Sequence, residues 1–360
     1  MAFYIRNIGM SVSKILVFCK DIGKFGFKLS AVKLNSTSVV SRLGINSNHV
    51  CYQHDLTYKR SSGGIQLFMS VGLFNFFGLR NDDIEEEPEL ITTIKRGVLL
   101  TQKGEFKKAE QMLHIALKLA QDQQNYDGIT YIYDLLANIA YERGEYGKAE
   151  KLFLSVMQHL LSVGVPKTDN RMIHISLKLS NIYKIKKDIR KAEEGFKFCV
   201  LSLQSNNEKG RCDEDTLLLW AMALDWYARF LVEVNRLPEA FDCFKKAYHL
   251  CVKINGMNNE ETVVLLNDLG TICFVQNDFD SAISYLTQAV SIGNKLPDME
   301  DFGTILINLG TVYMKKGMMK EAKQVYKDAL QNAKKHNNVQ VLKEASTCLD
   351  ELKSSKSTQQ

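Results

Sequence analysis

The chain has 360 residues, of which 45% are hydrophobic and 24% are charged, a composition typical of a protein that folds around a buried core. Its net charge of +5 is unevenly distributed: residues 1–80 hold ten Lys and Arg against two Asp, or +8, and residues 81–360 hold 36 against 39, or −3. The basic character therefore belongs to the N-terminal part, and the rest of the chain offers no basic stripe for nucleic acid.

Residues 1–60 are expected to be a leader and not part of the fold. Seven basic residues up to Arg42 recur among Ser, Val, Ile and Phe, with only two acids in the whole segment. A cationic segment rich in hydroxyl groups, without the compact apolar run of a secretory signal, is typical of a mitochondrial transit peptide. A disordered basic tail is the alternative.

Residues 61–80 form a possible single transmembrane segment. The nineteen residues between Arg60 and Arg80 carry no formal charge, and as a helix they would be roughly 28 Å long, close to the thickness of a hydrocarbon core. Four glycines and two amides weaken that interpretation, so a buried or interfacial segment stays open. Residues 81–89 are an acidic linker. If residues 61–80 span the mitochondrial inner membrane, the charges on either side predict that the following domain faces the intermembrane space.

From residue 90 onward the sequence predicts helical hairpins, most clearly over residues 303–335. Apolar residues recur at helical spacing on both sides of a break at Gly317. With Gly303 as position 1, small residues fall at positions 8, 20 and 27, and tyrosines fall at positions 11 and 24. Small residues at positions 8 and 20 let the two helices of one hairpin approach closely. This set resembles the tetratricopeptide repeat.

The alanine at position 20 identifies six such hairpins, at intervals of 40, 43, 48, 42 and 40 residues, namely Ala109, Ala149, Ala192, Ala240, Ala282 and Ala322. Each hairpin exposes an apolar face on both sides, so the copies must stack. The predicted fold is an all-α tetratricopeptide-repeat solenoid of about six long hairpins over residues 90–336, a capping helix over 337–353 and a tail over 354–360. The longest predicted loop, Gln204–Asp215, accounts for the 48-residue interval. An ordinary helical bundle is the alternative.

No chemistry-bearing motif accompanies these repeats. The eight cysteines form no C-x-x-C pair, and Cys199 and Cys273 occupy positions 27 and 11 of their repeats, which indicates core packing. The seven histidines have no metal-ligand spacing, and no glycine-rich phosphate loop or activated nucleophile is visible. The sequence therefore predicts no enzymatic activity, cofactor, metal or small-molecule substrate.

The candidate partner-binding residues lie on the first helix of each hairpin, which lines the concave side of such a solenoid. They are Asn138, Lys178, Asn181, Trp226, Arg229, Asn267 and Asn308. Asparagine both donates and accepts hydrogen bonds, so repeated amides could bind the backbone of an extended peptide. The alternatives are ordinary solvated polar residues and, for Trp226, packing between helices. Nearby aspartates argue against a site for C-terminal carboxylates.

Three segments, at residues 129–153, 175–199 and 261–282, carry a closer resemblance, to the tetratricopeptide repeat protein 19 family. The resemblance covers about residues 90–350. It implies a non-enzymatic protein of the mitochondrial inner membrane that binds respiratory complex III and supports its assembly or maintenance, in connection with the Rieske iron–sulfur subunit and its fragments. The family has no catalytic residues to transfer. The alternative is a general peptide-binding adaptor, such as a cargo or import receptor, because the segment ETVVLLNDLG also has a weaker likeness to kinesin light chains.

Overall fold

The computed structural model describes residues 88–210, 213–296, 299 and 301–357, so the predicted leader, apolar segment and most of the acidic linker lie outside the described part. The described residues form thirteen α-helices and no strand. The helices are α3 (Glu89–Gln102), α4 (Phe106–Asp122), α5 (Tyr126–Glu142), α6 (Tyr146–Ser162), α7 (Asn170–Ile185), α8 (Ile189–Glu208), α9 (Glu214–Glu233), α10 (Leu237–Asn255), α11 (Glu260–Val275), α12 (Phe279–Gly293), α13 (Phe302–Lys315), α14 (Met319–Lys335) and α15 (Val339–Ser357). Of these helices, none is both long and apolar enough to cross a membrane.

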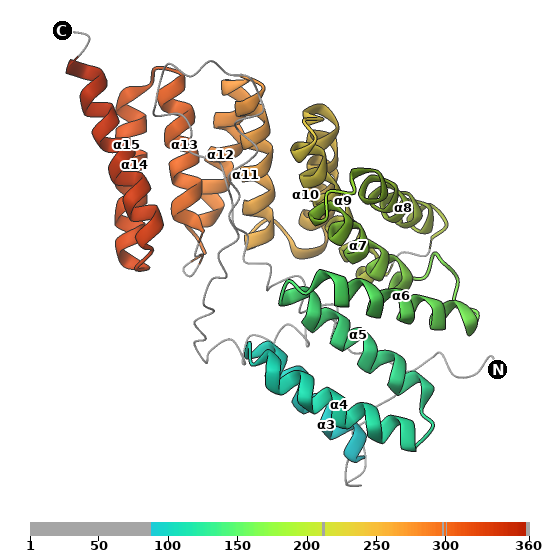
Figure 1. Ribbon diagram of the computed structural model, residues 1–360. Coiled ribbons are helices and arrows are strands. Elements are labelled where there is room, and N and C mark those ends of the chain that lie inside the picture. Colours follow the sequence, from blue (N-terminus) through green and yellow to red (C-terminus); the bar gives the residue numbers. More distant parts are fainter. Residues whose placement is uncertain (1–87, 211–212, 297–298, 300, 358–360) are drawn as a thin grey trace.

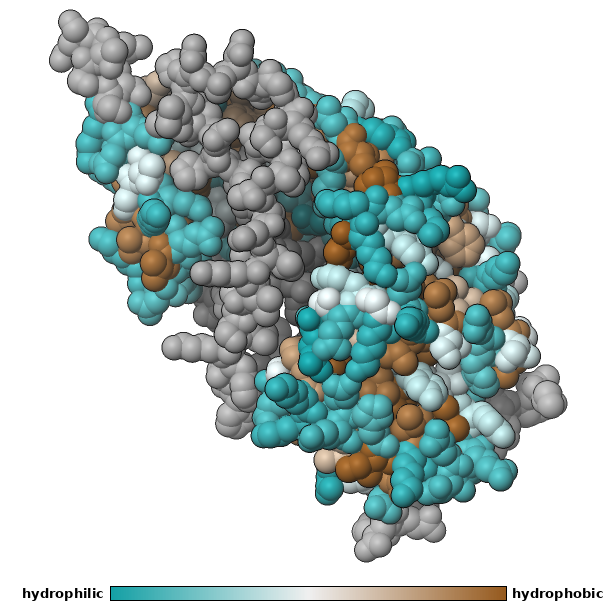
Figure 2. Space-filling view, in the orientation of Figure 1, coloured by the Kyte–Doolittle hydropathy of each residue, from teal (hydrophilic) through white to brown (hydrophobic). Residues whose placement is uncertain are grey.

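The helices α3 to α14 pair into six antiparallel hairpins that stack in chain order, and α15 packs on the last hairpin (Figure 1). Each helix contacts the next one along the chain, so the described part is an elongated, curved stack. The predicted all-α solenoid with six hairpins and a C-terminal capping helix is confirmed. Figure 2 shows hydrophobic surface, interrupted by hydrophilic side chains, over the part of the molecule where α4, α5 and α6 lie.

The small residues bring the two helices of each hairpin together as predicted. All six position-20 alanines are fully buried. A Cβ atom added at Gly310 would lie 2.5 Å from the ring of Tyr326, and one at Gly270 would lie 2.7 Å from Leu286. Since real side chains do not approach so closely, helix α13 can pack against α14, and α11 against α12, only with glycine at position 8.

The three-residue turn inside every hairpin is built in the same way. Its middle residue has a left-handed backbone, with φ between 61° and 83°, in all six copies. The middle residues are Gly104, Gly144, Lys187, Asn235, Asn277 and Gly317. A left-handed residue after a helix lets the chain reverse while its amide caps the preceding carbonyl groups. Glycine and asparagine adopt this conformation at low cost, and Lys187 is the exception.

Positions 3, 7 and 10 of each first helix join one hairpin to the hairpin before it. On α11 these residues are Leu265, Leu269 and Ile272, and all three belong to the apolar cluster formed by α7 to α10. The same positions are apolar on α5, α7, α9 and α13. Each hairpin therefore completes its core with its neighbour, as expected of a repeat stack.

Both ends of the stack depart from this pattern. On α3, position 7 is Arg96, which is exposed, and position 10 is Leu99, which is 44% exposed. At the other end, α15 buries Val341, Ala345 and Leu352 against the last hairpin and turns its charged side chains outward. Arg96 at one end and the charged side chains of α15 at the other disfavour the addition of further hairpins to the described stack.

The predicted loop Gln204–Asp215 is wrong in its first half. Helix α8 continues to Glu208, because Leu203 and Asn206 are buried against neighbouring hairpins. The Asn206 side chain donates a hydrogen bond to the carbonyl oxygen of Thr168 at 3.0 Å, which ties this extra turn to the preceding loop.

Candidate partner-binding site

The residues predicted to bind a partner lie on the first helices, and most of them contact one another across neighbouring hairpins. The candidates other than Trp226, together with the side chains to which they bond, form a set that we call the polar row. It comprises Asp134, Asn138, Tyr141, Lys178, Asn181, Asp225, Arg229, Asn267, Asp268 and Asn308. The polar row therefore stabilises the junctions between the second and third, fourth and fifth, and fifth and sixth hairpins.

Helices α5 and α7 are joined through Asn138. Its amide nitrogen donates to the backbone oxygen of Asp134 at 2.8 Å and to the Asp134 carboxylate at 3.0 Å. Its amide oxygen accepts a hydrogen bond from the ammonium group of Lys178, which is 4% exposed. Burial raises the pKa of Asp134 and lowers the pKa of Lys178, and in each case the opposite charge partly offsets the effect. Asn181 adds a second link by donating to the hydroxyl of Tyr141.

His174 lies one helical turn before Lys178 and is 7% exposed. Its Nε2 atom is buried and has no hydrogen-bond partner among the described residues. Burial, and next the charge of Lys178, hold the pKa of His174 well below its ordinary value of 6.5. The imidazole is therefore neutral at neutral pH, and its unpaired nitrogen reduces the stability of this junction.

Helices α9 and α11 are joined by Arg229. Its guanidinium group lies 3.0 Å from a carboxylate oxygen of Asp225 on the same helix and 2.6 Å from one of Asp268 on the next first helix. The guanidinium carbon also lies 5.6 Å from the centre of the Phe244 ring. Both carboxylates are buried, so the guanidinium supplies the charge and the hydrogen bonds that buried carboxylates require.

Helices α11 and α13 are joined by an amide pair. Asn308 Nδ2 donates to Asn267 Oδ1 at 2.8 Å, and both side chains are buried. Trp226, the remaining candidate, is half-buried and packs against the apolar clusters on both sides of α9. A peptide-binding role for the seven candidates stays a prediction. The structure adds that the side chains of the six other than Trp226 already bond within the polar row.

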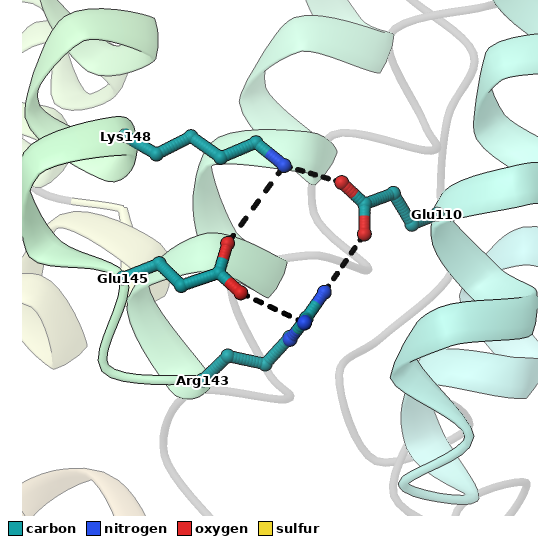
Figure 3. A network of polar contacts seen from close by, with 4 residues as sticks. All are labelled: Glu110, Arg143, Glu145 and Lys148. Carbon is teal, nitrogen blue, oxygen red and sulfur yellow. Dashed lines mark hydrogen bonds and ion pairs between the residues drawn. The ribbon is translucent and has the colours of Figure 1, made fainter.

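The sequence reasoning missed a second set of contacts between hairpins, at the turns. Glu110 on α4 lies 2.8 Å from Arg143 in the next hairpin and also pairs with Lys148, while Glu145 pairs with both cations (Figure 3). The same contact recurs as Glu150 with Lys186, Glu193 with Arg236 and Asp280 with Lys316. In three repeats the acid directly follows the position-20 alanine, and that regularity was the available signal.

The junction between the fourth and fifth hairpins shows no such ion pair among the described residues. Phe241 stands at the position of the acid and meets the edge of the Tyr285 ring, with the ring centres 6.1 Å apart. An aromatic contact therefore takes the place of the ion pair at this junction. Salt weakens the exposed ion pairs by screening, but it does not screen the aromatic contact in this way.

The described residues show no metal centre, and the Cys199 thiol among them is unreactive. No three His, Cys, Asp or Glu among them are placed to hold a metal ion. The described cysteines are free thiols, and Cys199 and Cys273 are buried in the core as predicted. Burial raises the pKa of Cys199 to about 12, which keeps this thiol protonated and unreactive.

Stacked hairpins with small residues at positions 8 and 20 define a tetratricopeptide-repeat protein. Family models described as tetratricopeptide repeat match residues 220–295 and 303–336. The chain belongs to the tetratricopeptide repeat protein 19 family. It is 36% identical to the mitochondrial tetratricopeptide repeat protein 19 homologue of Drosophila melanogaster over 296 residues, which cover 81% of this chain and 80% of the relative. The human mitochondrial relative is also 36% identical, over 69% of this chain and 68% of its own.

Among solved structures, BtubC from P. vanneervenii is similar, with a TM-score of 0.53, 20% sequence identity, and coverage of 70% of this chain and 94% of that chain. At this level of identity the similarity shows the repeat fold alone.

Proposed function

We propose that this chain is a mitochondrial protein that binds respiratory complex III and supports its assembly or maintenance, in connection with the Rieske iron–sulfur subunit and its fragments. The observation that carries the proposal is the 36% identity with relatives named as mitochondrial tetratricopeptide repeat protein 19, over 81% of the chain for the Drosophila relative and 69% for the human one. The proposed location is the inner membrane with the hairpins in the intermembrane space, residues 1–60 serving as transit peptide and residues 61–80 as the membrane segment.

In this proposal the chain acts as a binding scaffold and not as an enzyme. Repeat stacks present large surfaces on which a few anchor residues supply most of the affinity. On the concave side we propose contacts through the seven candidates Asn138, Lys178, Asn181, Trp226, Arg229, Asn267 and Asn308. Their mutual hydrogen bonds leave some donors and lone pairs over, since each asparagine amide has two N–H groups and one oxygen that accepts twice. Asn138, Asn181, Trp226 and Arg229 are partly exposed and would contact a bound peptide directly. Lys178, Asn267 and Asn308 are buried and would hold the first helices in place for it.

The test is purification of the tagged full chain from mitochondria in mild detergent, followed by mass spectrometry and native gel electrophoresis. Recovery and comigration of complex III subunits are the expected result. Loss of that recovery in a variant with Asn138→Ala, Asn181→Ala and Trp226→Ala would assign it to the concave side, provided that circular dichroism and thermal melting show the stack of hairpins to be intact. A chain that migrates alone, or that brings down unrelated cargo, contradicts the proposal and favours a general peptide-binding adaptor.

A separate experiment tests the orientation. Mitochondria are treated with protease before and after rupture of the outer membrane, and the hairpin region is followed with an antibody. We expect protection before rupture and digestion after it. Protection after rupture would place the hairpins in the matrix.

A further inference from the structure

Exposed large apolar side chains on the second helices of the hairpins are confined to the first three hairpins. We call these side chains the outer apolar row: Ile115 on α4, Leu154 and Leu161 on α6, and Ile189, Phe198 and Leu201 on α8. Leu201 is 63% exposed and Ile115 is 54% exposed. The equivalent helices α10, α12 and α14, all within the described part, expose no large apolar side chain.

The difference between the two halves of the stack is visible at a single repeat position. Six residues after the position-20 alanine, the first and third hairpins have Ile115 and Phe198, and the second hairpin has the exposed Ser155. The last three hairpins have Lys246, Gln288 and Asp328 there, and all three are exposed. The position points to solvent throughout the stack, and of its six occupants the two large apolar ones are both in the first three hairpins. Scattered apolar residues are common on protein surfaces, but among the second helices they are confined to three hairpins that follow one another in the stack.

The outer apolar row is interleaved with cations. On α4, α6 and α8, eight exposed residues are Lys or Arg and three are Asp or Glu. The basic residues are Lys107, Lys108, Lys118, Lys148, Lys151, Arg190, Lys191 and Lys197, and the acidic residues are Asp122, Glu194 and Glu208. Five of the cations also pair with acids of the same surface. Lys107, Lys118 and Lys151 take part in no ion pair within the described residues, so their charge is available to a partner.

We propose that the outer faces of α4, α6 and α8 lie on an anionic lipid surface, with the outer apolar row in the headgroup layer and the lysines on lipid phosphates. The proposal rests on the membrane location given under the proposed function. A helix that lies in the interface gains affinity from buried apolar side chains and from attraction of its cations to anionic lipid. The ammonium groups of the lysines reach the phosphates while the methylene groups of the same side chains cover apolar neighbours.

The spacing of the row favours lipid over a protein partner. Its side chains are divided among three helices with lysines between them, whereas a protein interface obtains its affinity from a tightly packed central cluster. Headgroups and acyl chains adapt to each apolar side chain separately, so lipid needs no such cluster. In this orientation the second helices face the membrane, and the first helices, with the polar row, face aqueous partners.

The test uses the full chain with a tryptophan reporter, because the segment at residues 61–80 could hold the chain on vesicles by itself. Leu201→Trp places the reporter in the outer apolar row, and Gln288→Trp, at an exposed site of α12, is the matched control. The vesicles contain phosphatidylcholine with brominated acyl chains, with or without phosphatidylglycerol. We expect bromine to quench the fluorescence of the reporter at position 201 in the anionic vesicles only. The variant with the reporter at position 288 should show no more quenching than the unmodified chain, which contains only the two native tryptophans.

A charge variant tests the role of the lysines. Lys107→Glu, Lys118→Glu and Lys151→Glu, combined with Leu201→Trp, should lose the quenching. The control Lys245→Glu, Lys246→Glu and Lys327→Glu, on exposed residues of α10 and α14, should keep it. Circular dichroism establishes that each variant folds.

Equal quenching at positions 201 and 288, or no quenching at either, overturns the lipid proposal. If quenching is absent and a Leu154→Ser, Leu201→Ser variant loses complex III in the mitochondrial purification, the face binds protein instead. Recovery of complex III by the unmodified chain is scored separately, so failure of the lipid face and failure of the proposed function give different results.

Discussion

Asn308 on α13 donates a hydrogen bond from Nδ2 to Oδ1 of Asn267 on α11, and the two atoms are 2.8 Å apart between side chains that are both buried. The amides face each other from adjacent first helices, so each one satisfies a polar group that water cannot reach. The two amides therefore stabilise the junction between the fifth and sixth hairpins.

The first prediction concerns this pair. Asn308→Leu leaves the Asn267 amide buried without its partner and should cost about 1–3 kcal/mol in the free energy of unfolding. Asn267→Leu with Asn308→Leu removes both polar groups and should recover most of that loss. Urea unfolding followed by circular dichroism measures the cycle. Single-variant losses that simply add in the double variant would show that the two residues are not coupled.

The second prediction concerns the close approach of α13 and α14. Gly310→Ala introduces a Cβ atom 2.5 Å from the fully buried ring of Tyr326 and should destabilise the protein by about 1–3 kcal/mol. Gly147→Ala is the control, because nothing lies within 4 Å of its added Cβ atom on α6. There the better helix propensity of alanine should stabilise by up to about 1 kcal/mol. Thermal melts compare the two, and equal effects would contradict the packing argument.

The third prediction concerns pH. His174 has a lowered pKa in the folded protein, so the unfolded chain binds a proton near pH 6.5 that the folded chain does not. Its contribution to stability is therefore complete above pH 6.5 and is lost as the pH falls, by up to about 1.4 kcal/mol for each pH unit. His174→Phe should reduce the slope of stability between pH 6.5 and 5. Urea unfolding at a series of pH values measures the slope, and an unchanged slope in His174→Phe would refute the assignment.

The fourth prediction concerns the N-terminal end of the stack. Arg96 on α3 occupies the position that carries Leu136, Leu179, Tyr227, Leu269 or Leu309 in the other hairpins. Arg96→Leu would extend the apolar face that already contains the exposed Leu99. We expect self-association that increases with protein concentration, measured by sedimentation velocity. Arg96→Gln is the control and should stay monodisperse to the same extent as the unmodified chain.

The fold was predictable because its determinants are local in the sequence. The alanine at position 20 is fixed by the contact between two helices that follow one another directly, and its six occurrences located all six hairpins. The end of α8 was not predictable in this way. Asn206 reads as a loop residue, and its helical state depends on a hydrogen bond to Thr168, which is 38 residues away.

The pairing within the candidate site was also beyond the sequence. Whether Asn308 meets solvent or Asn267 depends on the rotation of one hairpin relative to the next, and that rotation follows from packing across the whole junction. The pattern placed the residues on the right helices but could not show that they face one another. The ion pair of Glu110 with Arg143 has a regular sequence signal, and it was missed because acids near helix starts are also common on solvated surfaces.

Each junction along the polar row has its own chemistry. Lys178 needs an amide opposite, Arg229 needs a carboxylate, and Asn308 needs a second amide. Repeat arrays change length when recombination duplicates, deletes or exchanges a unit. In this chain the loss of any one of the second to sixth hairpins would separate such a pair and leave at least one buried polar group without its partner. The second and third hairpins therefore form one set and the fourth to sixth hairpins form another, and each set is expected to be gained or lost as one unit.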